Sequence, residues 1–288
     1  MTVPEIIFAS KYGFCGGVAR ALALLDEALA RFGAPVYVYH KIVHNERVAA
    51  DLRARGVVFV DSLDEAADVS RPLVLSAHGS SLALVAEVAR RGFANVIDAV
   101  CPLVGKIHEY VRAKVAAGYD VIVIGSDAGH DEVVGTMGQA EGGIYFVSSG
   151  ADIALLPPME KVCFVSQTTL AKEVVREVAA TIRARFTGAE TLSEAGVCGA
   201  TSERQDAVRE LVVGHGLCDI IVIGSATSSN TKNLARVAME AGATNVWLVG
   251  SAEDINFDMP ARIGITAGAS TPQVLIDEIV AKLNGFSD

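Results

Sequence analysis

The sequence predicts an α/β protein built from three similar modules whose sheets are largely parallel. Hydrophobic residues make up 51% of the 288 residues but aromatic residues only 6%, so the apolar mass is valine, isoleucine, leucine and alanine. Such aliphatic runs are typical of parallel strands that helices cover on both faces. A second observation, a pattern that recurs three times along the chain, gives the number of modules.

The charge and the cysteine content limit the class of protein. A formal net charge of −10 argues against a general nucleic-acid binder or a protein that binds anionic membranes. The first ten residues lack the pattern of an export signal, and no apolar run approaches the roughly 18 residues of a membrane span. We therefore expect a cytoplasmic protein without membrane insertion. In such a chain, five cysteines suggest metal or redox chemistry or plain burial rather than a disulfide framework.

The first predicted module, residues 1–96, starts with a strand at 5–9 and a glycine-rich turn that carries Cys15. A helix should follow the turn, because apolar residues recur there at helical spacing. Two more strands, at 36–39 and 73–75, should end in polar loops. The predicted helix face comprises Val18, Leu22, Leu25, Leu29 and Phe32, and the two loops carry His44 and His78.

The second predicted module, residues 97–194, is organised around the apolar run 96–104. This run predicts a buried strand that delivers Cys101 to the start of a helix. Pro102 suits the first helical position, because its missing N–H would have no intrahelical partner there. The helix face comprises Leu103, Val104, Ile107, Val111 and Val115, and later strands at 121–124 and 162–165 should lead to loops with His130 and Thr168.

The third predicted module, residues 195–288, repeats the arrangement with Cys198 before a more polar helix. Its strands at 220–223 and 262–265 should lead to loops that carry Ser228 and Ser270. From each cysteine, the first polar loop follows after 29, 29 and 30 residues, and the second after 63, 66 and 72 residues. Because ligands gather beyond the carboxyl ends of parallel strands, each module should present one cysteine and two loops to a common centre. Three ordinary repeats with polar loops are the alternative, which the matching registers disfavour.

Three converging thiols predict a metal site. Each cysteine lies at a turn into a helix, where the helix dipole favours the thiolate that binds metal. Three ligands are one short of the usual Cys₄ set, and a missing protein ligand leaves a metal position open for substrate. A [4Fe–4S] cluster on Cys15, Cys101 and Cys198 is one interpretation, and zinc on the same thiols is the other. Cys163 and Cys218 are predicted core residues.

The polar loops predict a pocket for a phosphate-type anion. Small donors in glycine-rich turns form anion-binding concavities, and histidines add positive charge or N–H donors. The predicted anion-binding residues are Ser228, Ser229, Asn230, Ser270, His44, His78 and His130. The remaining histidines, His40, His108 and His215, are predicted to be structural.

Glu132 is the predicted catalytic acid. It follows His130 by two residues, and a carboxyl group in an enclosed pocket can protonate a leaving oxygen. Its alternative role is that of an acidic residue in the first turn of a helix. Thr168 and Gln167 are predicted to hold a water molecule or a substrate hydroxyl nearby.

Taken together, these loops resemble the 4-hydroxy-3-methylbut-2-enyl diphosphate reductase family, which catalyses the last step of the methylerythritol phosphate route to isoprenoids. The matching segments span nearly the whole chain in order. They are Gly13-Phe14-Cys15, Val43-His44-Asn45, Ser76-Ala77-His78-Gly79, Cys101-Pro102-Leu103-Val104, Gly129-His130, Glu132, Gly135-Thr136-Met137-Gly138-Gln139, Gln167-Thr168-Thr169-Leu170, Ser228-Ser229-Asn230 and Thr266-Ala267-Gly268-Ala269-Ser270.

The resemblance implies a trefoil of three modules around a [4Fe–4S] cluster on the three cysteines, with the histidines, serines and asparagine named above on the substrate's diphosphate. Glu132 and Thr168 would lie near the substrate hydroxyl. The implied reaction is a reductive dehydroxylation that yields isopentenyl and dimethylallyl diphosphates. The implied partners are the allylic diphosphate and a one-electron donor protein such as ferredoxin or flavodoxin.

The chain departs from the family pattern near two cysteines and in one loop. Val100 stands where threonine is expected, Gly199 where a larger residue is usual, and Ala226-Thr227 replaces a Lys-Asn pair. Because hydrogen bonds to cluster sulfurs tune the potential, these departures bear on redox potential and activity rather than on the ligands themselves. A cluster-bearing sensor without turnover and a metal-free phosphosugar enzyme are the alternatives.

Overall fold

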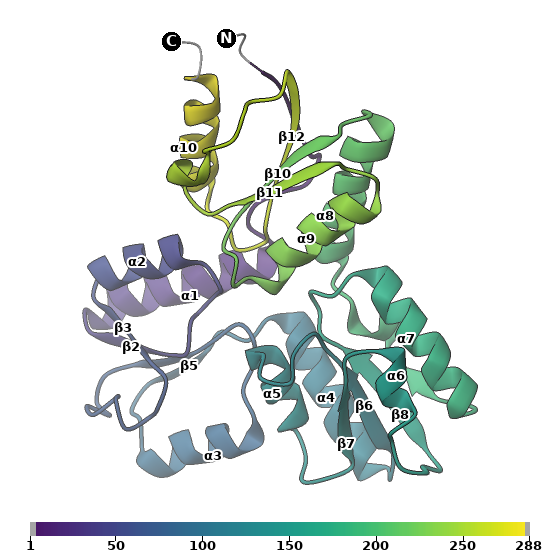
Figure 1. Cartoon of the computed structure of the whole chain (residues 1–288). Helices are drawn as coiled ribbons and strands as arrows, with labels where there is room; N and C mark the ends of the chain where they lie inside the picture. The colour runs from purple at the N-terminus through teal and green to yellow at the C-terminus, as the bar shows by residue number, and fades with distance from the viewer. Residues whose placement is uncertain (1–3, 286–288) are drawn as a thin grey trace. The chain divides into compact units, whose positions relative to one another are not determined.

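The computed structural model describes residues 4–285 and divides into two compact units (Figure 1). The units contain three four-stranded sheets, and every recorded strand pairing is parallel. The predicted α/β class with three parallel modules is therefore confirmed. No helix in the described part is both long and apolar enough to span a bilayer. Unit 1 comprises residues 4–18, 44–51 and 199–285, and unit 2 comprises 19–43 and 52–198.

Unit 1 is built on a sheet with the strand order β1-β12-β10-β11. Helix α10 covers one face, where Ile276 and Ile279 pack in the same cluster as Ile221 and Ile265. On the other face Gly264 leaves room for Ile220, since a Cβ at residue 264 would lie 2.6 Å from its Cδ1 atom. The elements are β1 (Glu5–Phe8), α8 (Gly199–Arg209), η2 (Glu210–Gly214), β10 (Asp219–Ile223), α9 (Ser229–Glu240), β11 (Asn245–Val249), η3 (Ala252–Asp254), β12 (Arg262–Ala267) and α10 (Gln273–Asn284).

The first sheet of unit 2 has the order β3-β2-β4-β5. Helix α3 packs on one face through Val88, which joins a cluster with Tyr37, Leu73 and Leu75, and α1 lies on the opposite face (Figure 1). The predicted face of α1 is centred on Leu25, with Ala21 and Ala28 buried beside it. The elements are α1 (Gly16–Phe32), β2 (Val36–Tyr39), α2 (Glu46–Ala54), β3 (Val57–Val60), β4 (Leu73–Leu75), α3 (Leu82–Arg91) and β5 (Val96–Asp98), of which α1 and α2 begin in unit 1.

The second sheet of unit 2 has the order β7-β6-β8-β9 and is buried on both faces (Figure 1). Ile122 and Phe164 point toward the α7 side, whereas Val123 and Cys163 point toward α4. This explains the uninterrupted apolar runs of β6 and β8. The elements are α4 (Pro102–Ala116), β6 (Asp120–Ile124), α5 (Asp131–Met137), β7 (Ile144–Val147), α6 (Gly150–Ile153), β8 (Val162–Ser166), α7 (Lys172–Arg185), β9 (Glu190–Thr191) and η1 (Ser193–Gly196).

The three sheets share one topology, which is offset from the order of the chain. In each sheet, an edge strand that precedes a cysteine pairs with the neighbouring inner strand: β5 with β4, β9 with β8, and β1 with β12. Strand β1, predicted to belong to the first module, therefore completes the sheet of the third. The module boundaries 1–96, 97–194 and 195–288 stay a prediction.

Two features of the strands differ from expectation. The strand before Cys101 is not buried, because β5 is an edge strand and Val96 is 43% exposed. The opposite edges consist of β3, β7 and β11, which extend the sheets beyond the predicted strands. Each is paired on one side only and followed by a loop that carries none of the predicted site residues.

Core packing predicts that Ile182→Ala will lower the free energy of unfolding by about 2–5 kcal/mol, because Ile182 on α7 is fully buried and its truncation leaves a cavity. Urea unfolding followed by circular dichroism measures the change. Leu155→Ala is the matched control, since Leu155 is 85% exposed and should lose less than about 0.5 kcal/mol. Equal losses in the two variants would contradict this assignment of the core.

Candidate functional site

The three cysteines occupy equivalent positions in the fold. Each thiol residue precedes a helix: Cys15 lies before α1, Cys101 is the N-cap of α4, and Cys198 lies before α8. Six residues separate β1 from Cys15 and β9 from Cys198, whereas two separate β5 from Cys101. Each predicted metal ligand is thus delivered by an edge strand to the first turn of a helix.

A backbone hydrogen bond fixes each cysteine to a loop beyond the neighbouring strand. Cys15 N donates to Ala269 O at 3.2 Å, Cys101 N to Ala77 O at 3.0 Å and Cys198 N to Thr168 O at 3.1 Å. Each acceptor lies two residues after the inner strand that pairs with the edge strand, β12, β4 or β8 respectively. The same local geometry therefore occurs three times, and each instance is contained within one unit.

The five thiols fall into distinct environments. Cys15, Cys101 and Cys198 are half-buried and all five cysteines are free of disulfides. Cys163 is fully buried in β8, which confirms its assignment to the core, and burial raises the pKa of its thiol to about 12. Cys218 is exposed, so its predicted core role is wrong: it precedes β10 in a turn, where its carbonyl accepts from Thr244 N and Asn245 N.

In unit 2, the carboxyl group of Glu132 is buried against Thr168. Glu132 lies in the first turn of α5 and is 4% exposed. Its Oε1 accepts from Thr168 N at 2.6 Å and its Oε2 from Thr168 Oγ1 at 3.0 Å. Desolvation raises the pKa of Glu132 to about 7, although the two hydrogen bonds from Thr168 act in the opposite direction. Both protonation states of Glu132 are accessible near neutral pH.

Two of the predicted anion-binding histidines, His130 and His78, lie at the start of α5, the helix that carries Glu132. His130 is the N-cap of α5, and its Nδ1 accepts from Glu132 N at 3.2 Å, so the neutral ring carries its proton on Nε2. The ring of His78 meets that of His130 edge-on, with centroids 6.0 Å apart. His78 Nδ1 also lies 3.3 Å from Ser76 Oγ. Unit 2 therefore brings together Glu132, Thr168, His78 and His130.

Asp131 and His40 join this group, which the sequence did not reveal. Asp131 Oδ1 lies 2.9 Å from His40 Nδ1, and its Oδ2 lies 3.9 Å from His78 Nδ1. The hydrogen bond to Asp131 raises the pKa of His40. His40, predicted to be structural, thus shares a carboxylate with a predicted anion ligand. In the sequence, the one feature that could have pointed to Asp131 is its position directly after His130.

His108 and Gln167 have structural roles. His108 is buried on α4, and desolvation lowers its pKa to about 4, which fits the predicted structural role of a neutral ring. Gln167 uses its Oε1 to accept from Ser126 N and its Nε2 to donate to Thr169 Oγ1. The amide of Gln167 therefore links the loop after β6 to the loop after β8, and the neighbouring Thr168 is the residue that contacts Glu132.

The glycines of the segment Gly135-Thr136-Met137-Gly138-Gln139 explain how α5 reaches the His78 loop. A Cβ at Gly135 would lie 2.9 Å from Gly79 O, and one at Gly138 would lie 2.2 Å from Ser81 Cβ. Gln139 is buried and donates from Nε2 to Ser80 O and Gly135 O. Close packing of α5 on the loop 79–81 thus fixes the position of the histidine pair.

In unit 1, the predicted anion-binding residues gather at the start of α9. Ser228 is the N-cap, and its Oγ accepts from Thr231 N at 3.3 Å. Asn230 Oδ1 accepts from Ala269 N at 2.9 Å, which leaves its buried Nδ2 without a hydrogen-bond partner among the described residues. Ser270 Oγ donates to His44 O at 3.1 Å. Ser229 is buried in the same turn, so Ser228, Ser229, Asn230, Ser270 and His44 form one donor-rich group.

Arg204 is a further residue that the sequence did not single out. It is 6% exposed and donates from Nε and Nη2 to Gly13 O, and from Nη2 to Phe14 O at 3.1 Å. Its Nη1 also donates to Ala200 O. Gly13 adopts a left-handed conformation with φ +71°, which favours glycine. Arg204 therefore holds the loop that leads to Cys15.

The structure shows the local surroundings of the residues that depart from the family pattern. Val100 O accepts from Arg20 Nη1 at 2.9 Å, a contact that its side chain does not determine. A Cβ at Gly199 would meet no atom within 4 Å, so packing does not require glycine there. Ser225 Oγ lies 2.8 Å from Thr227 Oγ1 in the loop that includes Ala226.

Comparisons with known proteins agree over nearly the whole chain. A family model described as "LytB protein" matches residues 6–284. The 4-hydroxy-3-methylbut-2-enyl diphosphate reductase of Acidithiobacillus ferrooxidans is 43% identical over 236 residues, which are 81% of this chain and 73% of the relative. The protein of the same name from Acinetobacter baumannii is 45% identical over 241 residues, 81% of this chain and 74% of the relative.

Two solved structures are similar to the structure of this chain. The structure of the E-1-hydroxy-2-methyl-but-2-enyl-4-diphosphate reductase from Plasmodium falciparum matches with a TM-score of 0.91 at 32% identity, over 97% of this chain and 88% of that chain. A structure of (E)-4-hydroxy-3-methyl-but-2-enyl diphosphate reductase matches with a TM-score of 0.70 at 31% identity, over 97% and 99% of the two chains. That protein is described as the terminal enzyme of the non-mevalonate pathway.

The contacts of Arg204 predict that Arg204→Lys will lower the free energy of unfolding by about 1–3 kcal/mol, because an ammonium cannot satisfy the carbonyls that the guanidinium bridges. The amide of Cys15 should also exchange hydrogen faster. Urea unfolding and hydrogen exchange measure the two effects. Arg236→Lys on α9 is the control, since Arg236 forms an ion pair with Glu240 one turn away on the same helix and bridges no backbone carbonyls among the described residues. Unchanged exchange at Cys15 would contradict the role of Arg204.

Proposed function

Because the chain belongs to the LytB protein family, we propose that it is an oxidoreductase that converts 4-hydroxy-3-methylbut-2-enyl diphosphate to isopentenyl and dimethylallyl diphosphates. The supporting observation is the set of three cysteines in repeated local positions, within a chain that is at least 43% identical to reductases of that name over 81% of its length. The reaction adds two electrons and two protons to the allylic alcohol and releases its oxygen as water.

The donor chemistry of the chain fits a [4Fe–4S] cluster. Cys15, Cys101 and Cys198 are half-buried free thiols at the starts of helices, and Val18 N donates to Cys15 Sγ at 3.4 Å, as a backbone amide does to a metal-bound thiolate. These three residues would hold the cluster. When bound, it supplies electrons singly and an iron with an open position as a Lewis acid.

The remaining residues would bind the substrate and supply a proton. We assign diphosphate binding to His44, His78, His130, Ser228, Ser229, Asn230 and Ser270. The unpaired Nδ2 of Asn230 supports this assignment, because a buried donor without a partner favours an anionic ligand. The proton on Nε2 of neutral His130 would make that nitrogen a donor as well.

Glu132 would protonate the leaving oxygen, with Thr168 as its partner. Hydroxide is a poor leaving group, so the carbon–oxygen bond should break as a proton reaches the oxygen. The pKa of Glu132, about 7, lets the buried carboxyl group carry this proton at neutral pH. Thr168 fixes the orientation of the carboxyl group by its N–H and hydroxyl contacts.

The ligand assignment predicts that Cys15→Ser, Cys101→Ser and Cys198→Ser will each lose most of the bound iron and sulfide. The parent should retain both after anaerobic purification and turn over the allylic diphosphate with a strong one-electron reductant. Cys163→Ser and Cys218→Ser are the controls and should retain iron. Equal iron loss in all five variants would contradict the assignment, and an iron-loaded parent without turnover would favour a sensor.

The role of Glu132 predicts that Glu132→Gln will keep the cluster and bind substrate while turnover falls by roughly 10²- to 10⁴-fold, the range for a lost general acid. In the parent, turnover should fall as the pH rises above about 7, because the protonated fraction of Glu132 decreases. The variant should lack this decline. Anaerobic substrate titration and a pH series of steady-state rates measure both effects. Turnover within a few-fold of the parent would exclude Glu132 as the proton donor.

A further inference from the structure

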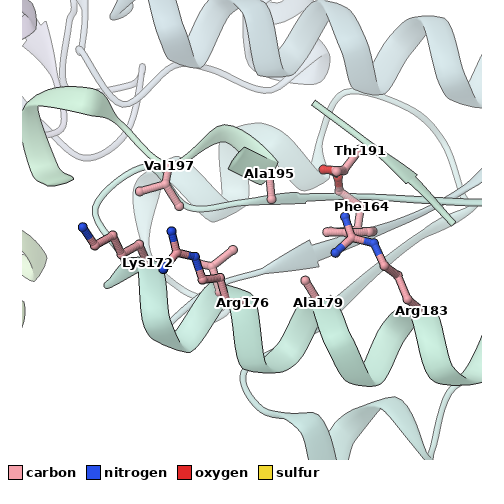
Figure 2. A pocket seen from close by; sticks show the side chains of 9 residues that line it. Phe164, Lys172, Arg176, Ala179, Arg183, Thr191, Ala195 and Val197 are labelled. Atoms are coloured by element: carbon pink, nitrogen blue, oxygen red, sulfur yellow. The ribbon is translucent and has the colours of Figure 1, made fainter. Parts of the chain in front are cut away.

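A groove on unit 2 is lined with cationic side chains, although the whole chain carries a net charge of −10. It has a volume of about 280 Å³ and lies between α7 and the segment that includes β9 and η1 (Figure 2). Lys172, Arg176 and Arg183 extend from α7 along the groove, and Phe164 and Val197 belong to its apolar lining. The groove therefore combines an apolar floor with a positively charged rim.

Two of these charges are available to a partner. Arg176 and Arg183 are exposed, and within residues 4–285 neither has a recorded carboxylate partner. The Arg183 guanidinium lies over the ring of Phe164, 5.1 Å from its centroid, which holds the charge at the groove. In an acidic protein, a local cationic patch of this kind steers a negatively charged partner to one place on the surface.

The groove reaches a proposed cluster ligand. Val197 lines the groove and directly precedes Cys198, so their Cα atoms are about 3.8 Å apart. Electron transfer between proteins slows exponentially with the separation of the two redox centres. An electron donor must therefore bind close to a residue that holds the acceptor's redox centre. The groove meets this requirement, because it adjoins the proposed cluster ligand Cys198.

On the basis of the proposed function, we propose that the groove is the docking surface for an acidic one-electron donor protein whose carboxylates face Arg176 and Arg183. Each encounter oxidises the donor by one electron, so two encounters supply the two electrons that one substrate molecule takes up with two protons to release water. Electron-transfer complexes of this type have small interfaces, in which rim charges control association rate and salt dependence.

The test uses the full-length protein with an acidic flavodoxin as the donor, and reduced methyl viologen as a small cationic reductant. R176E/R183E should raise the KM for flavodoxin by about tenfold or more and abolish its salt dependence, because the steering charges are reversed. Viologen-driven turnover should stay within a factor of two. Direct binding of oxidised flavodoxin, which needs no turnover, should weaken in parallel.

Two further variants make the result specific. R53E is the control for the Arg183–Phe164 contact, because the Arg53 guanidinium also lies over an aromatic ring, 5.1 Å from the centroid of Phe59. It should leave flavodoxin binding unchanged. R176E alone should show a smaller defect of the same kind and avoids the contact of Arg183 with Phe164. R176E replaces the double variant in the test if R176E/R183E folds poorly.

The outcomes separate docking from catalysis. Unchanged flavodoxin binding in R176E/R183E, or an equal loss in R53E, would overturn the proposal. Loss of inorganic phosphate binding with unchanged flavodoxin binding would identify a small-anion site instead. A parallel fall of viologen-driven and flavodoxin-driven turnover, with flavodoxin binding intact, would also overturn it. A parent that binds flavodoxin at the groove but lacks turnover with either reductant would contradict the proposed function and leave the docking surface supported.

Discussion

The backbone hydrogen bond from each cysteine to a loop beyond the neighbouring inner strand is the interaction on which the candidate site depends. It joins Cys15 to Ala269, Cys101 to Ala77 and Cys198 to Thr168. The acceptor loops are also those that carry Ser270, His78 and the partner of Glu132. One bond per sheet therefore sets the position of a thiol and of a polar loop together, and side-chain changes such as Val100 and Gly199 leave it intact.

Burial of Glu132 shows how the same scaffold prepares a proton donor. The carboxyl group is removed from water at the first turn of α5, and within residues 4–285 it accepts hydrogen bonds from the N–H and the hydroxyl of Thr168. Because Thr168 also accepts from Cys198 N, the residue that orients the carboxyl group is bonded to a proposed metal ligand. The positions of acid and thiol are consequently coupled through a single threonine.

The sequence revealed the local elements of the site but not the contacts that depend on tertiary structure. Apolar runs and the recurring cysteine spacing predicted β2, β4, β6, β8 and the start of α4, because these features follow from periodicity. The pairing of β1 with β12 could not be predicted, since it joins residues from opposite ends of the chain. Arg204 and Asp131 resemble ordinary helix residues in the sequence. Their roles appear only when the fold brings them to Gly13 and His40.

The lengths of the segments before the cysteines also determine how much conformational entropy each thiol loses when a ligand is bound. Cys101 follows its edge strand by only two intervening residues and begins a long helix, so little freedom remains to be lost. The six-residue segment before Cys15 is restrained by Arg204. The equally long segment before Cys198 contains Ala195 in a left-handed conformation and forms one wall of the cationic groove. A protein bound in that groove would therefore stiffen the segment that carries Cys198 and reduce the entropic cost of holding the third ligand in place.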